Sequence, residues 1–195
     1  MTMRYNAARA LGNIGDKRAV PALIKLLDDK DWQVRFYAVE ALGKIGDNSA
    51  VNPIADSMIK DSNNEVRLAA IKSIDQVNGK IRYKSVMEAF SDKDPNIRSY
   101  AVELSAKWKT DEAIPLIIGM LKDDRSNVVR SSCAHALGVY KNFASVPALI
   151  QALSDNYKDV RIYALESLKD MSGQNYNYDQ DKWTHWFQMN KDKGK

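Results

Sequence analysis

The sequence has one cysteine, two histidines and no long apolar run, and each shortage excludes a class of protein. A lone cysteine, Cys133, excludes an internal disulfide and a cysteine-rich zinc site, and we expect a buried, unreactive thiol. The longest apolar stretch, residues 113–121, is far too short to span a bilayer, so we expect no membrane partner. Because the N-terminal residues lack the basic and apolar segments of a secretory signal, we expect a cytoplasmic protein.

The chain also lacks an excess of charge of one sign. Its 29 Lys and Arg residues and 25 Asp and Glu residues give a net charge of +4, which describes a mixed surface. Nucleic-acid-binding proteins usually concentrate Lys and Arg on one face, so nucleic acid is not the expected partner. The two histidines, His135 and His185, form no recognisable catalytic or metal-binding spacing. We therefore expect no metal, no cofactor and no enzymatic activity.

The sequence does contain an arginine at an almost constant interval. Each of these residues follows an apolar residue, and the gaps between them are 31 or 32 residues: Arg4, Arg35, Arg67, Arg98, Arg130 and Arg161. A fixed period of 20–50 residues indicates a repeat array, in which each unit buries its apolar face against its neighbours. We predict about five and a half copies that share one continuous core.

Residues 19–46 show what one copy contains. Apolar residues recur at helical spacing after Pro21, which predicts a short first helix. Asp31 is placed to cap a second helix, which ends at Gly46. The same pattern predicts first helices at 19–28, 51–60, 83–91, 113–122 and 145–154, and second helices at 2–14, 32–45, 64–77, 95–108, 127–140 and 158–171.

The segments VRFYAVEALGKIGD (34–47) and RYNAARALGNIGDKRAVPALIKLL (4–27) resemble HEAT repeats of the short class first recognised in phycobilisome lyases. The resemblance covers residues 1–173 and implies an all-α, armadillo-like fold, a right-handed α-solenoid of helical hairpins with the second helices on the concave face. It also implies a polar ladder between the arginine after the apolar residue and the aspartate after the closing glycine. That ladder would contain Arg35, Arg67, Arg98, Arg130 and Arg161, with Asp16 and Asp47 as the matching acids.

The resemblance also bears on metal binding. HEAT-type deoxyhypusine hydroxylases hold iron with His-Glu pairs, and this sequence has no His-Glu dipeptide.

A helical projection of the second helices predicts which side chains line the groove. The candidate binding residues are Tyr5, Arg9, Trp32, Phe36, Tyr37, Glu40, Lys72, Tyr100, Glu103, His135, Tyr163 and Glu166. Aromatic residues are enriched at the centres of protein interfaces, so we hypothesise a non-enzymatic scaffold that binds a protein or peptide in this groove. The alternative for the aromatic rings is that they pack against each other.

Two other functions stay open at this point. The resemblance to phycobilisome lyases allows a lyase or chaperone-type subunit that acts on a chromophore-bearing protein. Backbone-directed nucleic-acid binding, as in HEAT-like DNA glycosylases, would need Lys and Arg along one face. Glu40, Glu103 and Glu166 in the groove argue against it.

The two ends of the array differ. Residues 174–190 predict a C-terminal capping helix whose apolar stripe is Trp183, Trp186 and Phe187, or alternatively an exposed aromatic binding surface. Residues 191–195 are expected to form a disordered tail. At the N-terminal end the array opens on a second helix without its partner. We expect this open edge either to continue into a longer array or to be covered by another chain. That other chain includes a second copy of the protein, which would make the contact a self-association.

Overall fold

The computed structural model describes residues 2–77 and 82–192 of the protein, and every regular element in them is helical. The chain divides into two compact units, residues 1–97 and 98–195. No helix in the described residues is long and apolar enough to cross a membrane. Residues 193–195 of the predicted tail lie outside the described residues.

The helices follow the predicted alternation of short first and longer second helices. In unit 1 they are α1 (Thr2–Ile14), α2 (Val20–Lys25), α3 (Trp32–Ile45), α4 (Val51–Lys60), α5 (Asn64–Ile74) and α6 (Arg82–Glu88). In unit 2, after the boundary in the first turn of α7 (Pro95–Lys107), they are α8 (Ile114–Asp123), α9 (Asn127–Tyr140), α10 (Val146–Ala152), α11 (Lys158–Ser172) and α12 (Gln180–Asn190). Short 3-10 helices flank the first helices: Lys17–Ala19, Leu26–Asp28, Asn48–Ala50, Ala89–Ser91, Asp111–Ala113 and Phe143–Ser145.

Local hydrogen bonds define where each helix begins and ends. The Asp31 carboxylate accepts a hydrogen bond of 3.0 Å from the backbone N–H of Gln33 and so caps α3, as predicted. Gly46 closes α3 with a φ of 67°, a left-handed conformation that glycine adopts without steric cost. Asp47 then caps the next 3-10 turn through the backbone N–H of Ser49. One copy therefore ends and the next begins within two residues.

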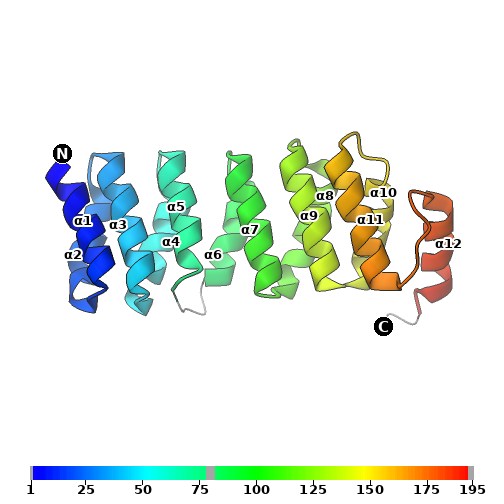
Figure 1. The fold of residues 1–195 in the computed structure, drawn as a ribbon, viewed down its shortest axis with the longest axis horizontal. Helices are drawn as coiled ribbons and strands as arrows, with labels where there is room; N and C mark the ends of the chain where they lie inside the picture. The colour runs from blue at the N-terminus through cyan, green and yellow to red at the C-terminus, as the bar shows by residue number, and fades with distance from the viewer. Residues whose placement is uncertain (1, 78–81, 193–195) are drawn as a thin grey trace. The chain divides into compact units, whose positions relative to one another are not determined.

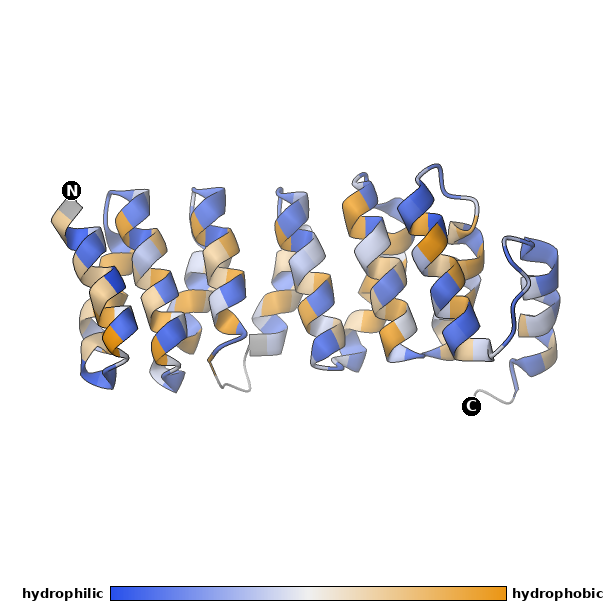
Figure 2. Cartoon of the chain, in the orientation of Figure 1, coloured by the Kyte–Doolittle hydropathy of each residue, from blue (hydrophilic) through white to orange (hydrophobic). Residues whose placement is uncertain are grey.

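Each unit is built of two helical layers with the core between them. In unit 1 the second helices α1, α3 and α5 lie side by side in one layer, and the first helices lie behind them (Figure 1). Leu23, Leu42 and Ile54 are fully buried between these layers. Hydrophobic residues run along the helices, whereas the turns that join them are hydrophilic (Figure 2). This arrangement buries one stripe of every helix, as the 3.6-residue periodicity predicts.

Small residues allow neighbouring second helices to approach closely. A Cβ atom added to Gly138 in α9 would lie 2.8 Å from the Cβ of Ser167 in α11. A Cβ added to Gly43 in α3 would lie 2.7 Å from the Cβ of Ser73 in α5. The packing distance between second helices therefore requires glycine at these positions. Gly119 in α8 is different, because an added Cβ would meet no atom within 4 Å.

We expect the Gly138→Ala substitution to lower the free energy of unfolding by about 1–3 kcal/mol, since the new methyl group overpacks the contact with Ser167. Gly119→Ala is the matched control, and it should raise stability by about 0.5–1 kcal/mol because alanine favours the helix. Urea unfolding followed by circular dichroism measures both values. Equal effects of the two substitutions would show that Gly138 is not a packing requirement.

The periodic arginines join successive hairpins by binding two turns at once. Arg35 donates from Nε and Nη2 to both carboxylate oxygens of Asp61, at 2.7 and 2.8 Å. Its Nη1 donates to the backbone carbonyl of Asp29, six residues before it, at 2.9 Å. Bidentate pairing of this kind matches the planar fork of a guanidinium.

The same bidentate pairing with an aspartate recurs along both units and is called here the arginine ladder. Its ion pairs are Arg4–Asp29, Arg35–Asp61 and Arg67–Asp92 in unit 1, and Arg98–Asp124 and Arg130–Asp155 in unit 2. The side chains of Arg67 and Asp92 are only 3% and 8% exposed, whereas that of Arg4 is 44% exposed. Most of these pairs are therefore shielded from water, so the loss of one partner would leave a poorly solvated charge.

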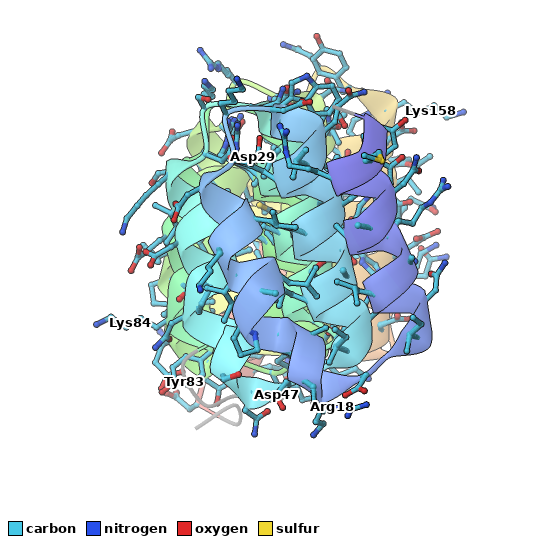
Figure 3. All side chains as sticks on the ribbon, turned by 90° about the vertical axis from the view of Figure 1, so that its left-hand side faces the viewer. Arg18, Asp29, Asp47, Tyr83, Lys84 and Lys158 are labelled. Atoms are coloured by element: carbon cyan, nitrogen blue, oxygen red, sulfur yellow. The ribbon has the colours of Figure 1, made fainter. Side chains whose placement is uncertain are left out.

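The acids of the ladder differ from the expected ones, Asp16 and Asp47. Asp16 pairs with Arg18, and Asp47 caps its own 3-10 turn and lies 3.6 Å from Lys17. The ladder instead uses the aspartate that follows each first helix. Figure 3 shows the reason, because Asp29 lies at one end of the helices, whereas Asp47 and Arg18 lie at the opposite end.

We expect the ladder to make the protein sensitive to acid. The hydrogen bond from Arg130 lowers the pKa of Asp155 below its ordinary value, against the opposite effect of burial. A carboxylate with a lowered pKa in the folded state stabilises the protein above its unfolded pKa of about 3.9. That contribution is lost as the pH falls through the lower, folded-state pKa.

Asp155→Asn should therefore lower the free energy of unfolding at pH 7 by about 3 kcal/mol, because it leaves the Arg130 guanidinium without its carboxylate. It should also reduce the difference in stability between pH 7 and pH 3. Urea unfolding at a series of pH values measures both effects. The control is Asp123→Asn, which changes an exposed carboxylate in the last turn of α8. If both variants show the same pH dependence, the ladder is not its source.

The exposed side of α1 differs from the equivalent side of α3. Met3 and Ile14 are 84% and 71% exposed, and Ala7 is exposed where its counterpart Ala38 is fully buried. Ala8 is fully buried, as is Val39 at the equivalent position of α3.

The C-terminal helix α12 packs against α10. Trp183 is fully buried, and its indole N–H donates to the carbonyl of Asn177 at 2.8 Å. Trp186 and Phe187 are half-buried against Phe143, with ring centroids 5.7 and 5.2 Å away. The aromatic stripe of residues 180–190 therefore faces the preceding hairpin.

Candidate functional site

The second helices of unit 1 carry an aromatic cluster. The rings of Tyr5 in α1 and Tyr37 in α3 stack with their centroids 5.3 Å apart, and Phe36 meets Tyr37 edge to face at 5.2 Å. Trp32 extends the cluster toward Phe36 at 6.5 Å and stays 41% exposed. The guanidinium of Arg9 lies 6.0 Å from the centre of the Tyr37 ring, a cation–π distance. Here the rings pack against each other, as in the alternative given for them above.

A small hollow lies beside this cluster, between α3 and α5. Its volume is about 270 Å³, and its lining includes Phe36, Glu40, Leu68 and Lys72. The sequence places Glu40 and Lys72 at equivalent positions of successive copies, and the structure brings both to one hollow. Opposite charges therefore face the same space beside an aromatic ring.

The second helices of unit 2 form a larger hollow, called here the α9 hollow. Its volume is about 790 Å³, and α7, α9 and α11 all contribute to its lining. His135 and Tyr163 lie in it with their rings 5.7 Å apart, edge to face. Tyr163 is 38% exposed, so much of its ring stays available for contact. The volume is within the range of protein sites that hold ligands.

A row of hydroxyl groups crosses the α9 hollow from one helix to the next. The Oγ atoms of Ser99 in α7 and Ser132 in α9 are 2.7 Å apart. Ser132 also donates from Oγ to Oε1 of Glu103 at 3.1 Å. These bonds hold the Glu103 carboxylate on the side of the hollow that α7 provides, where it supplies a negative charge.

Two predicted groove residues of unit 2 lie apart from this lining. Tyr100 is half-buried in α7, and Glu166 is exposed on α11. Neither belongs to the residues that line the α9 hollow. The structure therefore brings together Glu103, His135 and Tyr163 of the predicted set, and it leaves Tyr100 and Glu166 outside the hollow.

Sequence reasoning missed two apolar residues of the α9 hollow. Val128 and Val139 line it and are 47% and 38% exposed. A signal for them exists in the sequence, because the copies before them carry polar residues at the same positions, Gln33 and Lys44. An apolar residue at a position that is otherwise polar indicates a surface adapted for contact.

Reactive groups are scarce at these faces. The Cys133 thiol is fully buried in α9, and burial raises its pKa, which leaves it in the unreactive thiol form. Among the described residues, no group of three or more His, Cys, Asp and Glu side chains is arranged to hold a metal ion. The site is thus described by shape, apolar contact and charge.

The family model for HEAT repeats matches residues 2–75 and 83–169, which is most of the chain. The protein belongs to the HEAT-repeat family. Its helical hairpins and their stacking within each unit are those of an α-solenoid, so the fold class predicted from the arginine period is confirmed.

Comparisons with individual proteins extend this result. The chain is 67% identical to the phycocyanobilin lyase subunit alpha of Microchaete diplosiphon over 33 residues, which is 17% of this chain and 11% of that protein. It therefore matches only about a tenth of the length of this relative. The Escherichia coli protein YibA has a similar structure, with a TM-score of 0.67 and 26% identity over 83% of this chain and 63% of YibA.

A designed armadillo repeat protein, solved in complex with the peptide (KR)4, is similar in fold alone. Its TM-score is 0.57, with 18% identity over 85% of this chain and 92% of the designed protein.

Proposed function

We propose that the protein is a non-enzymatic scaffold that binds a partner protein or peptide on the faces of its second helices. The observation that carries this proposal is the α9 hollow, in which Val128, Val139 and Tyr163 keep 47%, 38% and 38% of their surfaces exposed. Exposed apolar side chains that gather in one hollow are costly to leave in water and mark contact surfaces.

The polar groups of the α9 hollow support a protein partner. Glu103, Lys107 and Asp159 lie in its lining, and Ser99 and Ser132 are joined by a hydrogen bond. An apolar centre with charged residues around it is the usual composition of a protein interface. The designed armadillo repeat protein of similar fold was solved in complex with a peptide, which supports a polypeptide as the partner.

The test is capture of a partner by the full chain and by a Val128→Ser, Tyr163→Ala double variant, with bound proteins identified by mass spectrometry. We expect the double variant to lose at least one protein that the unchanged chain retains, because the truncated side chains supply apolar contact. Loss of such contacts at an interface typically costs about 1–3 kcal/mol for each important residue.

The matched control is Leu116→Ser, which removes an apolar side chain that is 52% exposed on α8, in the other helical layer of the same unit. It should retain the partner. Circular dichroism of all three proteins checks that they are equally folded. Identical capture by the double variant and the control would rule out the α9 hollow as the binding surface.

A second function is favoured by the sequence match alone, namely participation in attaching phycocyanobilin to a protein. The match to the lyase subunit is high in identity but spans 33 residues, about the length of one copy of the 31- or 32-residue repeat. A match of that length is explained by one repeat sequence that the two proteins share. A scaffold built of such repeats would give the same match without any lyase activity. The scaffold is for this reason the proposal that we favour.

The two functions differ in their response to the chromophore itself. We expect the absorption spectrum of phycocyanobilin to stay unchanged when the purified protein is added in excess, because the proposal assigns the second-helix faces to a polypeptide. A displaced or sharpened absorption band that titrates with the protein would favour the lyase-type function instead.

A further inference from the structure

The arginine ladder ends in unit 2 on an arginine that has only half of the usual contacts. Arg161 in α11 donates from Nη1 to the backbone carbonyl of Asp155 at 2.7 Å. In the earlier copies the Nε and Nη2 groups hold the carboxylate of the next turn, as Arg130 holds Asp155. Within the part of the chain that the structure describes, no carboxylate lies within ion-pair distance of Arg161.

The hydrogen bond from Arg161 to the backbone carbonyl of Asp155 orients its guanidinium in the same way as in the copies that also have the carboxylate contact. Arg35, Arg67 and Arg130 each donate from Nη1 to the carbonyl six residues earlier, at 2.9, 3.0 and 2.8 Å. Arg161 makes the equivalent bond to the residue six positions before it. Its Nε and Nη2 edge is therefore held ready for a carboxylate, which reduces the entropy lost when one binds.

The direction of α12 explains why the described residues supply no acid at this point. In each copy the ladder aspartate follows the C-terminal end of the first helix, as Asp155 follows α10. The α12 helix packs on α10 in the opposite direction, because Gln180 in its first turn donates to the carbonyl of Ile150 near the C-terminal end of α10. The start of α12, and not its end, thus lies beside the turn that contains Asp155.

Two acidic side chains lie at the start of α12, and Asp181 in the first turn is exposed and forms no ion pair among the described residues. The other, the N-cap residue Asp179, is already engaged. Asp179 accepts a hydrogen bond from the backbone N–H of Lys182 and forms an ion pair of 3.1 Å with the Lys182 ammonium. These contacts hold the carboxylate at its own helix N-terminus, where the helix dipole also favours it.

We propose that Arg161 binds an aspartate or glutamate side chain of a partner protein, in the place that the next ladder aspartate would occupy. The partner is the one that the proposed scaffold function requires, so the inference rests on that function. Two neighbours favour this ligand, since Lys158 lies exposed one turn earlier in α11 and Tyr157 is 51% exposed beside it. Asp159 adds a negative charge to the same turn but lines the α9 hollow.

The site can be tested on the full chain with acetate as the probe. Nitrogen-15 NMR resolves the Nε–H groups of arginine, and the Arg161→Lys variant assigns the resonance of Arg161. We expect the Arg161 Nε–H to exchange with water about tenfold faster than that of Arg130, which is bonded to Asp155. We also expect acetate to shift the Arg161 resonance in a saturable way while the Arg130 resonance stays in place.

The matched control is Arg125, an exposed arginine in the turn before α9 that lacks the carbonyl contact made by Arg161. Its resonance should move only slightly and without saturation. The proposal fails if Arg125 and Arg161 respond equally, because the response is then general screening of charge. It also fails if the Arg161 Nε–H exchanges slowly and ignores acetate, because an acid of the chain itself then fills the place.

Because acetate replaces the unidentified partner, this outcome does not depend on the capture experiment. A saturable response of Arg161 together with unaltered capture by the α9 variant would keep the carboxylate site and reject the α9 hollow. The reverse pair of results would keep the α9 hollow and reject the carboxylate site.

Discussion

Arg35, Arg67 and Arg130 each bind two successive turns, and the stacking of the hairpins depends on this contact. Arg35 holds the carbonyl of Asp29 in its own copy and the carboxylate of Asp61 in the next copy, so the two copies are set at a defined separation. Apolar packing supplies most of the driving force for stacking, but it is not directional. The bidentate ion pairs add direction and register. Since they occupy the ends of the helices, the long faces of the second helices are left free to vary.

The two units use this freedom differently. In unit 1 the face of α1 and α3 is filled by Tyr5, Trp32, Phe36 and Tyr37, which satisfy one another by stacking and edge contacts. In unit 2 the small residues Ser99, Ser131 and Ser132 leave the α9 hollow open, with Val128, Val139 and Tyr163 at its surface. Ring-on-ring contact lowers the cost of exposing aromatic surface, whereas isolated valines have no such compensation. The open hollow is accordingly the better site for an additional polypeptide.

Much of the fold could be predicted from the sequence, because the 31- or 32-residue period, Pro21, Asp31 and Gly46 each carry a local physical meaning. The acids of the ladder could not. In the first two full copies an aspartate stands both before and after the first helix, as with Asp16 and Asp29 and then Asp47 and Asp61, and the sequence does not show which of the two meets the arginine. Only the direction of the first helix shows that Asp29 and Asp61 share an end with the arginines, and that Asp47 does not. The end of α9 could not be predicted either, because it is Lys141, and not a glycine, that closes this helix in the left-handed conformation that Gly46 adopts in α3.

The candidate site was partly predictable from the sequence. The helical projection identified Tyr163 and His135, but it did not identify the exposed Val128 and Val139.

The hairpin of α10 and α11, which precedes α12, has an apolar surface to cover and a ladder arginine to pair. The α12 helix meets the first requirement, because it buries Trp183 and places Phe187 on Phe143. It does not meet the second, since its reversed direction brings its first turn, and not a trailing aspartate, to the end of α10. Reversal has a physical advantage, because a helix that also provided the ladder carboxylate would reproduce the geometry on which another hairpin could stack. The α12 helix therefore covers apolar side chains of unit 2, while among the described residues the guanidinium of Arg161 is oriented by its carbonyl contact.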